Sequence, residues 1–226
     1  MKKGTIEPLM SEDIVRKMYQ AGVVATLVVD ELKHAVPLAK ALVKGGVNII
    51  ELTLRTSIAM DAAREIIAEV PEAVVGFGTA ITVDQIKEAA AIGVDFAVAP
   101  GCNPTILEAA RSNGLSFAPG IMTPTDIEVA LEHGCRLLKF FPAETSGGMK
   151  HLNSMAAPYK HLGIQFLPLG GINLKNAESY LSSPLIAAIG GSWIASPQMI
   201  HAEDWQQIEA NARAIRNLID DLRTNK

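Results

Sequence analysis

The chain has 226 residues, of which 49% are hydrophobic and 19% charged, with 20 basic against 24 acidic side chains and a net charge of -4. This composition excludes intrinsic disorder, and a negative charge with few aromatic residues argues against a nucleic-acid-binding protein. No apolar run approaches the roughly 18 residues of a membrane helix, and the first residues lack the apolar core of a signal peptide. We therefore expect a cytoplasmic protein with no membrane and no nucleic-acid partner.

The predicted elements begin with a helix near the N-terminus. Ser11 is a good N-cap, and Glu12 and Asp13 follow in the first turn, where the helix dipole favours acidic side chains. Eight short apolar runs then alternate with segments whose apolar residues recur at i, i+3 and i+4, as in amphipathic helices. These predicted strands are residues 23–29, 47–52, 74–77, 94–98, 116–119, 137–141, 164–168 and 185–189.

The strand and helix units repeat along the chain. Several predicted helices end on a glycine just before the next strand, as at Gly93 and Gly134, where a helix C-cap favours positive φ. Continuous apolar strands covered by helices are typical of parallel sheets, and eight such units predict an α/β fold, a (β/α)8 TIM barrel. A doubly wound sheet is the alternative, but no Gly-rich nucleotide turn follows the first strand. We expect a single domain over residues 1–226, with residues 1–22 as an N-terminal extension and helix.

Polar side chains interrupt the second predicted strand on one face. Glu51, Thr53 and Arg55 alternate with Ile50 and Leu52, so the polar and apolar side chains point to opposite faces. In a barrel whose outer face is covered by helices, the polar face must look into the barrel mouth, where barrel enzymes place their reactive groups. A solvated edge strand is the alternative interpretation.

A single lysine lies within the sixth predicted strand. Lys139 is surrounded by Leu137, Leu138, Phe140 and Phe141. Burial in such surroundings disfavours the charged ammonium and favours the neutral amine, which is the nucleophile that forms Schiff bases. The alternative is a lysine whose stem lies on apolar surface while its ammonium group reaches water.

Glycine pairs follow the seventh and eighth predicted strands. The first pair is Gly170 and Gly171, and the second is Gly190 and Gly191, followed by Ser192. Loops at these two places, with the N-terminus of a short extra helix starting about Ser192, form the usual phosphate site of the barrel, because free backbone N–H groups attract an anion. Ordinary tight turns are the alternative.

The sequence shows no metal or cofactor motif. Cys102 and Cys135 form no C-x-x-C pair, so we expect two reduced thiols with structural roles. No close pair at ligand spacing occurs among the histidines, which are His34, His133, His151, His161 and His201. We expect no metal and no organic cofactor.

Together, the motifs resemble one family over nearly the whole chain. They are His34-Ala35-Val36-Pro37, Glu51-Leu52-Thr53-Leu54-Arg55-Thr56, Gly76-Phe77-Gly78-Thr79, Ala99-Pro100-Gly101, Lys139-Phe140-Phe141-Pro142-Ala143-Glu144, Gly170-Gly171-Ile172 and Gly190-Gly191-Ser192-Trp193. The chain is similar in these to the 2-keto-3-deoxy-6-phosphogluconate (KDPG) and 4-hydroxy-2-oxoglutarate (KHG) aldolases, which are class I pyruvate aldolases. The resemblance implies a homotrimeric (β/α)8 barrel that needs neither metal nor cofactor.

The resemblance also implies roles for individual residues. Lys139 would form the Schiff base, Glu51 would act as general acid/base, and Arg55 would bind the substrate carboxylate. Thr79 and Pro100 would line the pyruvate site. The glycine loops with Ser192 would hold the phosphate of a phosphorylated 2-keto-3-deoxy sugar acid.

Three residues depart from the family's usual pattern. Leu169 stands where the family generally has threonine beside the glycine pair, Ala25 replaces a proline, and Ala99 replaces a serine. We expect cleavage of KDPG to pyruvate and glyceraldehyde 3-phosphate, and of KHG to pyruvate and glyoxylate. Alternatives are an aldolase for the galactonate epimer, a different phosphate-binding barrel enzyme, a silent phosphosugar-binding protein, and a metal-dependent class II aldolase, for which the sequence offers no obvious ligands.

Overall fold

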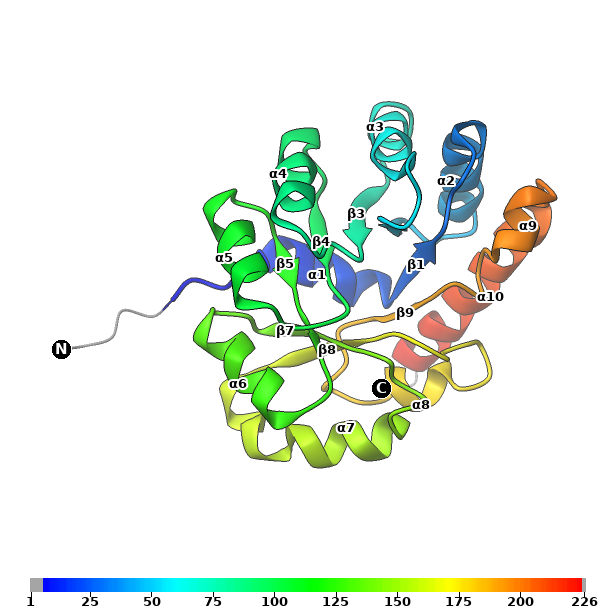
Figure 1. Ribbon diagram of the computed structural model, residues 1–226. Coiled ribbons are helices and arrows are strands. Elements are labelled where there is room, and N and C mark those ends of the chain that lie inside the picture. Colours follow the sequence, from blue (N-terminus) through cyan, green and yellow to red (C-terminus); the bar gives the residue numbers. More distant parts are fainter. Residues whose placement is uncertain (1–5, 225–226) are drawn as a thin grey trace.

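The structure is a computed structural model that describes residues 6–224. Parallel strands lie at its centre, and helices surround them (Figure 1). The strands are β1 (Val23–Leu27), β2 (Ile49–Thr53), β3 (Val74–Gly78), β4 (Phe96–Val98), β5 (Phe117–Ala118), β6 (Gly120–Ile121), β7 (Leu137–Phe140), β8 (Gln165–Pro168) and β9 (Ile189–Gly191). The helices are α1 (Glu12–Ala21), η1 (Leu32–His34), α2 (Ala35–Lys44), α3 (Ala59–Glu69), α4 (Val83–Ile92), α5 (Pro104–Ser112), α6 (Pro124–Glu132), α7 (Gly148–Ala156), η2 (Ala157–Leu162), α8 (Ala177–Leu181), α9 (Pro197–His201) and α10 (Trp205–Thr224).

The strands form two parallel sheets. One has the order β5-β4-β3-β2-β1-β9, and the other has the order β6-β7-β8. Pro119 stands between β5 and β6, and a single parallel bridge joins Phe166 of β8 to Ile186. The α/β fold with a curled parallel sheet is therefore confirmed, whereas closure into a full eight-stranded barrel stays a prediction.

Each of the first seven predicted strands overlaps a strand of the structure, with ends that differ by at most two residues, and the eighth differs more. Residues 185–188 were expected in the eighth strand, but β9 begins only at Ile189, because the Ile186 N–H donates to the Ser183 carbonyl in a turn. The strand β6 was not predicted. Proline cannot donate to a ladder, so Pro119 ends β5, and the chain then pairs with β7 instead of β4.

Helix α1 closes the amino-terminal end of the curled sheet. Met10, Ile14 and Met18 lie in one buried cluster with inward residues of the strands such as Ile49 and Leu167. Met18 is fully buried, so its truncation to alanine would cost about 2–5 kcal/mol of folding free energy. A second, larger apolar cluster fills the space between the strands and the outer helices.

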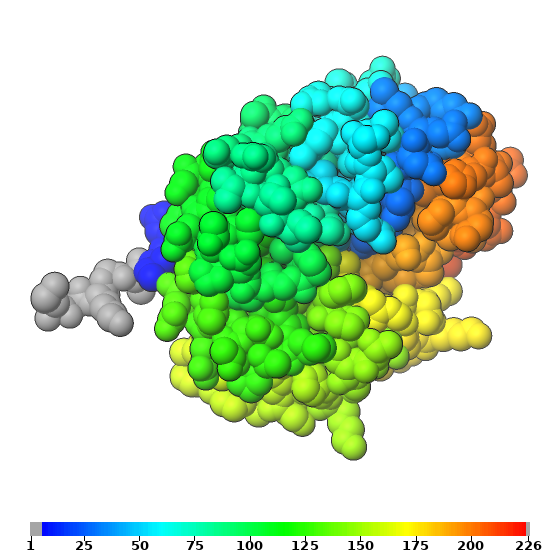
Figure 2. All heavy atoms as spheres, viewed as in Figure 1, coloured from blue at the N-terminus to red at the C-terminus, as the bar shows by residue number. Residues whose placement is uncertain are grey.

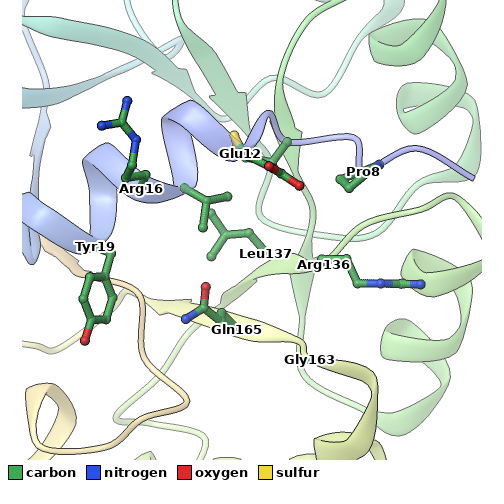
Figure 3. Close-up of a pocket in the computed structure, with 10 residues that line it drawn as sticks. Pro8, Glu12, Arg16, Tyr19, Arg136, Leu137, Gly163 and Gln165 are labelled. Atoms are coloured by element: carbon green, nitrogen blue, oxygen red, sulfur yellow. The ribbon is translucent and has the colours of Figure 1, made fainter.

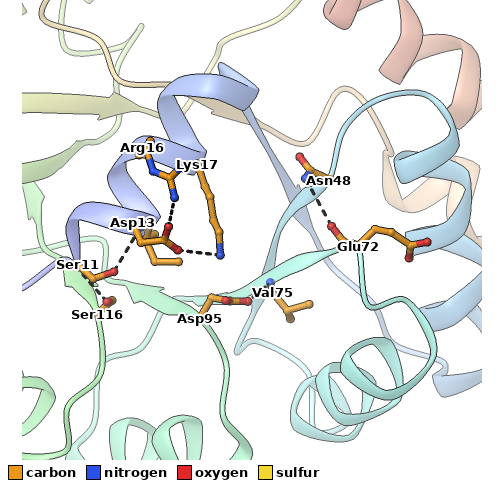
Figure 4. Close-up of polar contacts among 10 residues, drawn as sticks. Ser11, Asp13, Arg16, Lys17, Asn48, Glu72, Val75, Asp95 and Ser116 are labelled. Atoms are coloured by element: carbon orange, nitrogen blue, oxygen red, sulfur yellow. Dashed lines mark hydrogen bonds and ion pairs between the residues drawn. The ribbon is translucent and has the colours of Figure 1, made fainter.

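The predicted start of α1 is confirmed, and polar contacts form there, one of which reaches Ser116 next to β5 (Figure 4). The Ser11 hydroxyl caps the helix, and the Ser11 N–H donates to Ser116 Oγ at 3.2 Å. Asp13 accepts from Lys17 at 2.9 Å and also contacts Arg16. Each of these surface contacts contributes little to the folding free energy, so α1 is held against the sheet mainly by burial of its apolar face.

Successive segments of the chain follow one another in order around the visible face of the molecule (Figure 2). Within residues 6–224, no helix is long and apolar enough to cross a membrane. The expected single domain over residues 1–226 includes Met1–Thr5 and the last two residues, which lie outside the described part of the chain.

Candidate active site

A cavity of about 330 Å³ opens at the carboxyl ends of the strands. It is lined by Thr26, Glu51, Thr53, Arg55, Thr79, Pro100, Lys139, Phe141, Leu169, Gly170, Gly171, Ile172, Gly191 and Ser192. Every predicted site residue is among them except Gly190, the only one that the described structure places outside the lining. The cavity thus brings together the residues that alternation grouped on the second predicted strand, the glycine loops and the residues that the family resemblance implied.

Lys139 and Glu51 form a buried ion pair in this cavity. Lys139 Nζ donates to Glu51 Oε1 at 3.0 Å, and the residues are 5% and 1% exposed. Nζ also lies 5.6 Å from the centroid of the Phe141 ring. Removing one partner of such a pair leaves the other charge buried without a partner, which costs about 3–5 kcal/mol of folding free energy. The pair thus places an amine and a carboxylate within proton-transfer distance, away from bulk water.

The neighbouring strands provide the space for the Glu51 carboxylate. In the ladder between β2 and β3, Thr53 pairs with Gly78, the last residue of β3. A β-carbon at Gly78 would stand 2.0 Å from Glu51 Oε1. A glycine is therefore needed at the end of β3 so that the carboxylate can reach Lys139.

Thr53 shares the strand face of Glu51, whereas Arg55 lies in the turn that follows β2, and both line the cavity. Thr53 is buried, and its hydroxyl donates to the Leu27 carbonyl at 3.0 Å, which links β2 to β1. Arg55 is exposed at the mouth of the cavity. A guanidinium there is free to meet an incoming carboxylate in its planar, bidentate geometry.

Thr79 has an unusual backbone conformation at the end of β3. Its φ is 61°, which is costly for a β-branched residue, by about 1–3 kcal/mol. Together with Pro100 it forms part of the wall of the cavity. Strain of this kind concentrates at functional sites.

The first glycine pair forms a tight loop beside the cavity. Gly170 and Gly171 have φ of 97° and 81°, a conformation that favours glycine. The Glu144 N–H donates to the Gly170 carbonyl at 3.0 Å, and a β-carbon at Gly171 would stand 2.7 Å from the Glu144 β-carbon. The loop is thus held against the segment that follows β7.

The predicted helix start at Ser192 is wrong. Residues 192–195 after β9 form bends, and α9 begins at Pro197 with Ser196 as its N-cap. Proline is favoured in the first turn and serine at the cap, and this signal is stronger than that of Ser192. Ser192 and Gly191 nevertheless line the cavity.

Leu169 both packs and lines the cavity. It is 3% exposed and belongs to the inner apolar cluster. A β-carbon at Gly190 would stand 2.6 Å from Leu169 Cγ, so Gly190 makes room for this side chain rather than facing the cavity. Among the three departures from the family pattern, Leu169 lines the cavity, whereas Ala25 and Ala99 are not among its lining residues.

Three lining residues were missed by reasoning from the sequence, namely Thr26, Phe141 and Ile172. Phe141 and Ile172 belong to motifs that the sequence analysis identified, and their closeness to Lys139 and Gly171 in the chain could have indicated them. Thr26 is a lone hydroxyl in an apolar strand, and only the register with β2, which puts it opposite Glu51, reveals its place.

A second and larger cavity, of about 540 Å³, lies beneath α1 at the other end of the strands (Figure 3). Tyr19 and Arg16 of α1 line it together with Arg136 and Gln165. Its arginines lie apart, and no buried acid–base pair faces it among the described residues. Chemistry therefore favours the smaller cavity as the active site.

The cysteines fit a structural role. Cys102 is half-buried and Cys135 is buried, and neither forms a disulfide within the described chain. Burial raises the pKa of Cys102 to about 11 and that of Cys135 to about 12, so both are protonated at neutral pH. Among residues 6–224, no group of three or more His, Cys, Asp or Glu side chains could hold a metal ion.

Comparisons with known proteins identify a family to which the chain is similar. A family model described as KDPG and KHG aldolase matches residues 14–211. A 2-dehydro-3-deoxy-phosphogluconate aldolase of Dickeya dadantii is 44% identical over 191 residues, which are 84% of this chain and 89% of that protein. A KHG/KDPG aldolase of Escherichia coli is 42% identical over the same shares of the two chains.

A solved structure is similar in fold as well. The KDPG aldolase of Legionella pneumophila, captured with pyruvate as a covalent carbinolamine intermediate, superposes with a TM-score of 0.84 at 35% identity. The match covers 88% of this chain and 97% of that one. This chain therefore belongs to the KDPG and KHG aldolase family.

Proposed function

We propose that the protein is a class I aldolase that cleaves KDPG to pyruvate and glyceraldehyde 3-phosphate, and KHG to pyruvate and glyoxylate. The observation that carries the proposal is the buried contact of 3.0 Å between Lys139 Nζ and Glu51 Oε1. Family membership adds to it, because relatives of high similarity are named for these two activities.

The reaction begins with imine formation at Lys139. The ammonium passes a proton to Glu51, and the neutral amine forms a C–N bond with C2 of the keto acid. The C2 oxygen then leaves as water, with one proton that moves to it from the Lys139 nitrogen and one that Glu51 returns. The resulting protonated imine carries the positive charge that the ammonium carried before.

Cleavage of the C3–C4 bond uses the imine as an electron sink. Glu51 accepts the proton of the C4 hydroxyl, C4 becomes the aldehyde, and the bonding electrons move through C2 to nitrogen to give a neutral enamine. Glu51 then returns the proton to C3, which regenerates the protonated imine. Water hydrolyses this imine to pyruvate and free Lys139.

The remaining lining residues bind the substrate. Arg55 at the mouth holds the C1 carboxylate, and Thr79 and Pro100 enclose the pyruvate part. The backbone around Gly170 and Gly171 holds the phosphate.

At the second loop, Gly191 and Ser192 complete the phosphate site, and Gly190 supports it by accommodating Leu169. This division assigns phosphate recognition to backbone N–H groups rather than to a helix terminus.

The wider organisation belongs to the same proposal. We infer that the two sheets together form one closed (β/α)8 barrel. Pro119 connects β5 to β6, and the Phe166–Ile186 bridge continues from β8 toward β9. We also infer one domain over residues 1–226 and a cytoplasmic location, as the sequence predicts, and a homotrimer, as the family resemblance implies. No cofactor or metal takes part in the steps above.

A kinetic comparison tests the proposed activity. Pyruvate release is measured with KDPG, its galactonate epimer and KHG, each with and without EDTA. We expect turnover of KDPG and KHG that EDTA leaves unchanged. Loss of turnover with EDTA would indicate a metal-dependent aldolase, and absence of pyruvate release from all three would indicate a binding protein or another barrel enzyme.

A further inference from the structure

Thr26 contacts the Glu51 carboxylate from the neighbouring strand. Its hydroxyl donates to Glu51 Oε2 at 3.4 Å. Two other threonines nearby, Thr53 and Thr56, donate instead to backbone carbonyls at or just beyond the end of β1, at 3.0 and 2.6 Å. The hydroxyls of Thr53 and Thr56 thus link backbone segments, whereas that of Thr26 is directed at a side chain with proposed chemistry.

The position of Thr26 is determined by the strands. The parallel ladder between β1 and β2 pairs Thr26 with Glu51, so their side chains emerge beside each other. Val24, two residues earlier, belongs to the inner cluster, and alternation places Thr26 on the same inward face. Thr26 therefore lines the cavity through its register and not through a mobile loop.

Between them, Thr26 and Lys139 contact both carboxylate oxygens of Glu51. Lys139 Nζ contacts Oε1 at 3.0 Å, and the Thr26 hydroxyl contacts Oε2. On imine formation the Lys139 nitrogen exchanges three N–H bonds for one, and the remaining N–H lies in the plane of the imine. The Thr26 contact involves no reacting atom, so the reaction leaves it in place.

We propose that Thr26 is a positioning residue that holds Glu51 during the steps in which the Lys139 nitrogen is an imine or an enamine. It keeps Oε2 anchored to β1 and so keeps Oε1 directed at the carbon attached to the imine. The inference rests on the proposed function, because it assigns Thr26 a task in the proton transfer to and from C3. Thr26 itself exchanges no proton with the substrate.

Two measurements on the same samples test this role. Borohydride trapping of pyruvate reports imine formation at Lys139, and NMR in deuterium oxide reports exchange of the pyruvate methyl protons, which requires the Glu51 proton transfer. Thr26→Val keeps the shape of the side chain and removes the hydroxyl. Thr26→Ser restores the donor, Thr26→Ala removes it without the branched side chain, and Thr56→Val is the matched control away from the cavity lining.

We expect Thr26→Val and Thr26→Ala to trap pyruvate as wild type does but to exchange methyl protons about tenfold more slowly, in line with the loss of one hydrogen bond to a charged group. Thr26→Ser and Thr56→Val should exchange within about threefold of wild type. Wild-type exchange in Thr26→Val, or an equal loss of trapping and exchange, would overturn the inference. Absence of trapping in wild type would instead overturn the proposed function.

Discussion

Gly78 and Glu51 lie in such close contact that a β-carbon on the glycine would stand 2.0 Å from the carboxylate oxygen Oε1. This is the oxygen that accepts from Lys139 Nζ at 3.0 Å. The backbone of β3 thus determines where the Glu51 carboxylate can lie. Any side chain at Gly78 must displace either Glu51 or the strand.

Gly78→Ala tests this relationship. We expect a fall in kcat of about 100-fold or more, the usual scale of lost general acid–base catalysis, because the carboxylate must leave Lys139. The matched control is Gly101→Ala at the same end of the sheet, where an added β-carbon meets nothing within 4 Å. Steady-state kinetics on both variants provide the test, and equal effects would contradict the account.

The location of the site was predictable from local patterns, because alternation along one strand determines which side chains share a face. Glu51, Thr53 and Arg55 were placed together in this way. The apolar surroundings of Lys139 left two interpretations open, and the resemblance of its motif to the family decided between them. The glycine pairs were also located correctly beside the cavity, apart from Gly190, which packs against Leu169. In each of these cases the signal lay within a few residues of the chain.

Features that depend on pairing between strands were not predictable. One example is the register that places Thr26 beside Glu51. Another is the clash with Glu51 that makes a glycine necessary at position 78. Both relationships join residues more than 20 positions apart in the sequence. The helix expected at Ser192 failed because the better cap at Ser196 competes for the helix start. Local sequence patterns do not contain the register, so they could not reveal these relationships.

Glu51→Gln tests the proton transfer itself. The amide keeps the shape of the side chain but cannot accept the C4 hydroxyl proton, so we expect kcat for KDPG cleavage to fall by about 100-fold or more. Borohydride trapping of pyruvate should persist at least in part, since imine formation has other proton sources in water. Turnover close to that of wild type would show that another group or a water molecule handles the proton.

Leu169 provides a test of substrate selectivity. A hydroxyl in its place could bond the polar end of the substrate, and sites built on hydrogen bonds discriminate more strongly than apolar ones, which provide about 1–3 kcal/mol per methylene. We expect Leu169→Thr to raise the kcat/KM ratio between the C4 epimers of the phosphorylated substrate. Leu169→Val has nearly the same shape as the threonine variant without the hydroxyl and serves as the control.

The two Leu169 variants should lose similar stability, because each leaves a gap against Gly190. A selectivity ratio that changes equally in both, or in neither, would assign Leu169 a packing role only. Substrate choice would then depend on other lining residues.

The central claim is that Lys139 forms the covalent bond to the substrate, and peptide mapping tests it most directly. The protein is incubated with pyruvate and borohydride, digested, and searched by mass for the reduced adduct, with Lys139→Arg and the exposed-site variant Lys150→Arg in parallel. We predict one adduct, on the peptide that contains Lys139, in wild type and in Lys150→Arg, and none in Lys139→Arg. An adduct on another lysine, or none in wild type, would contradict the account.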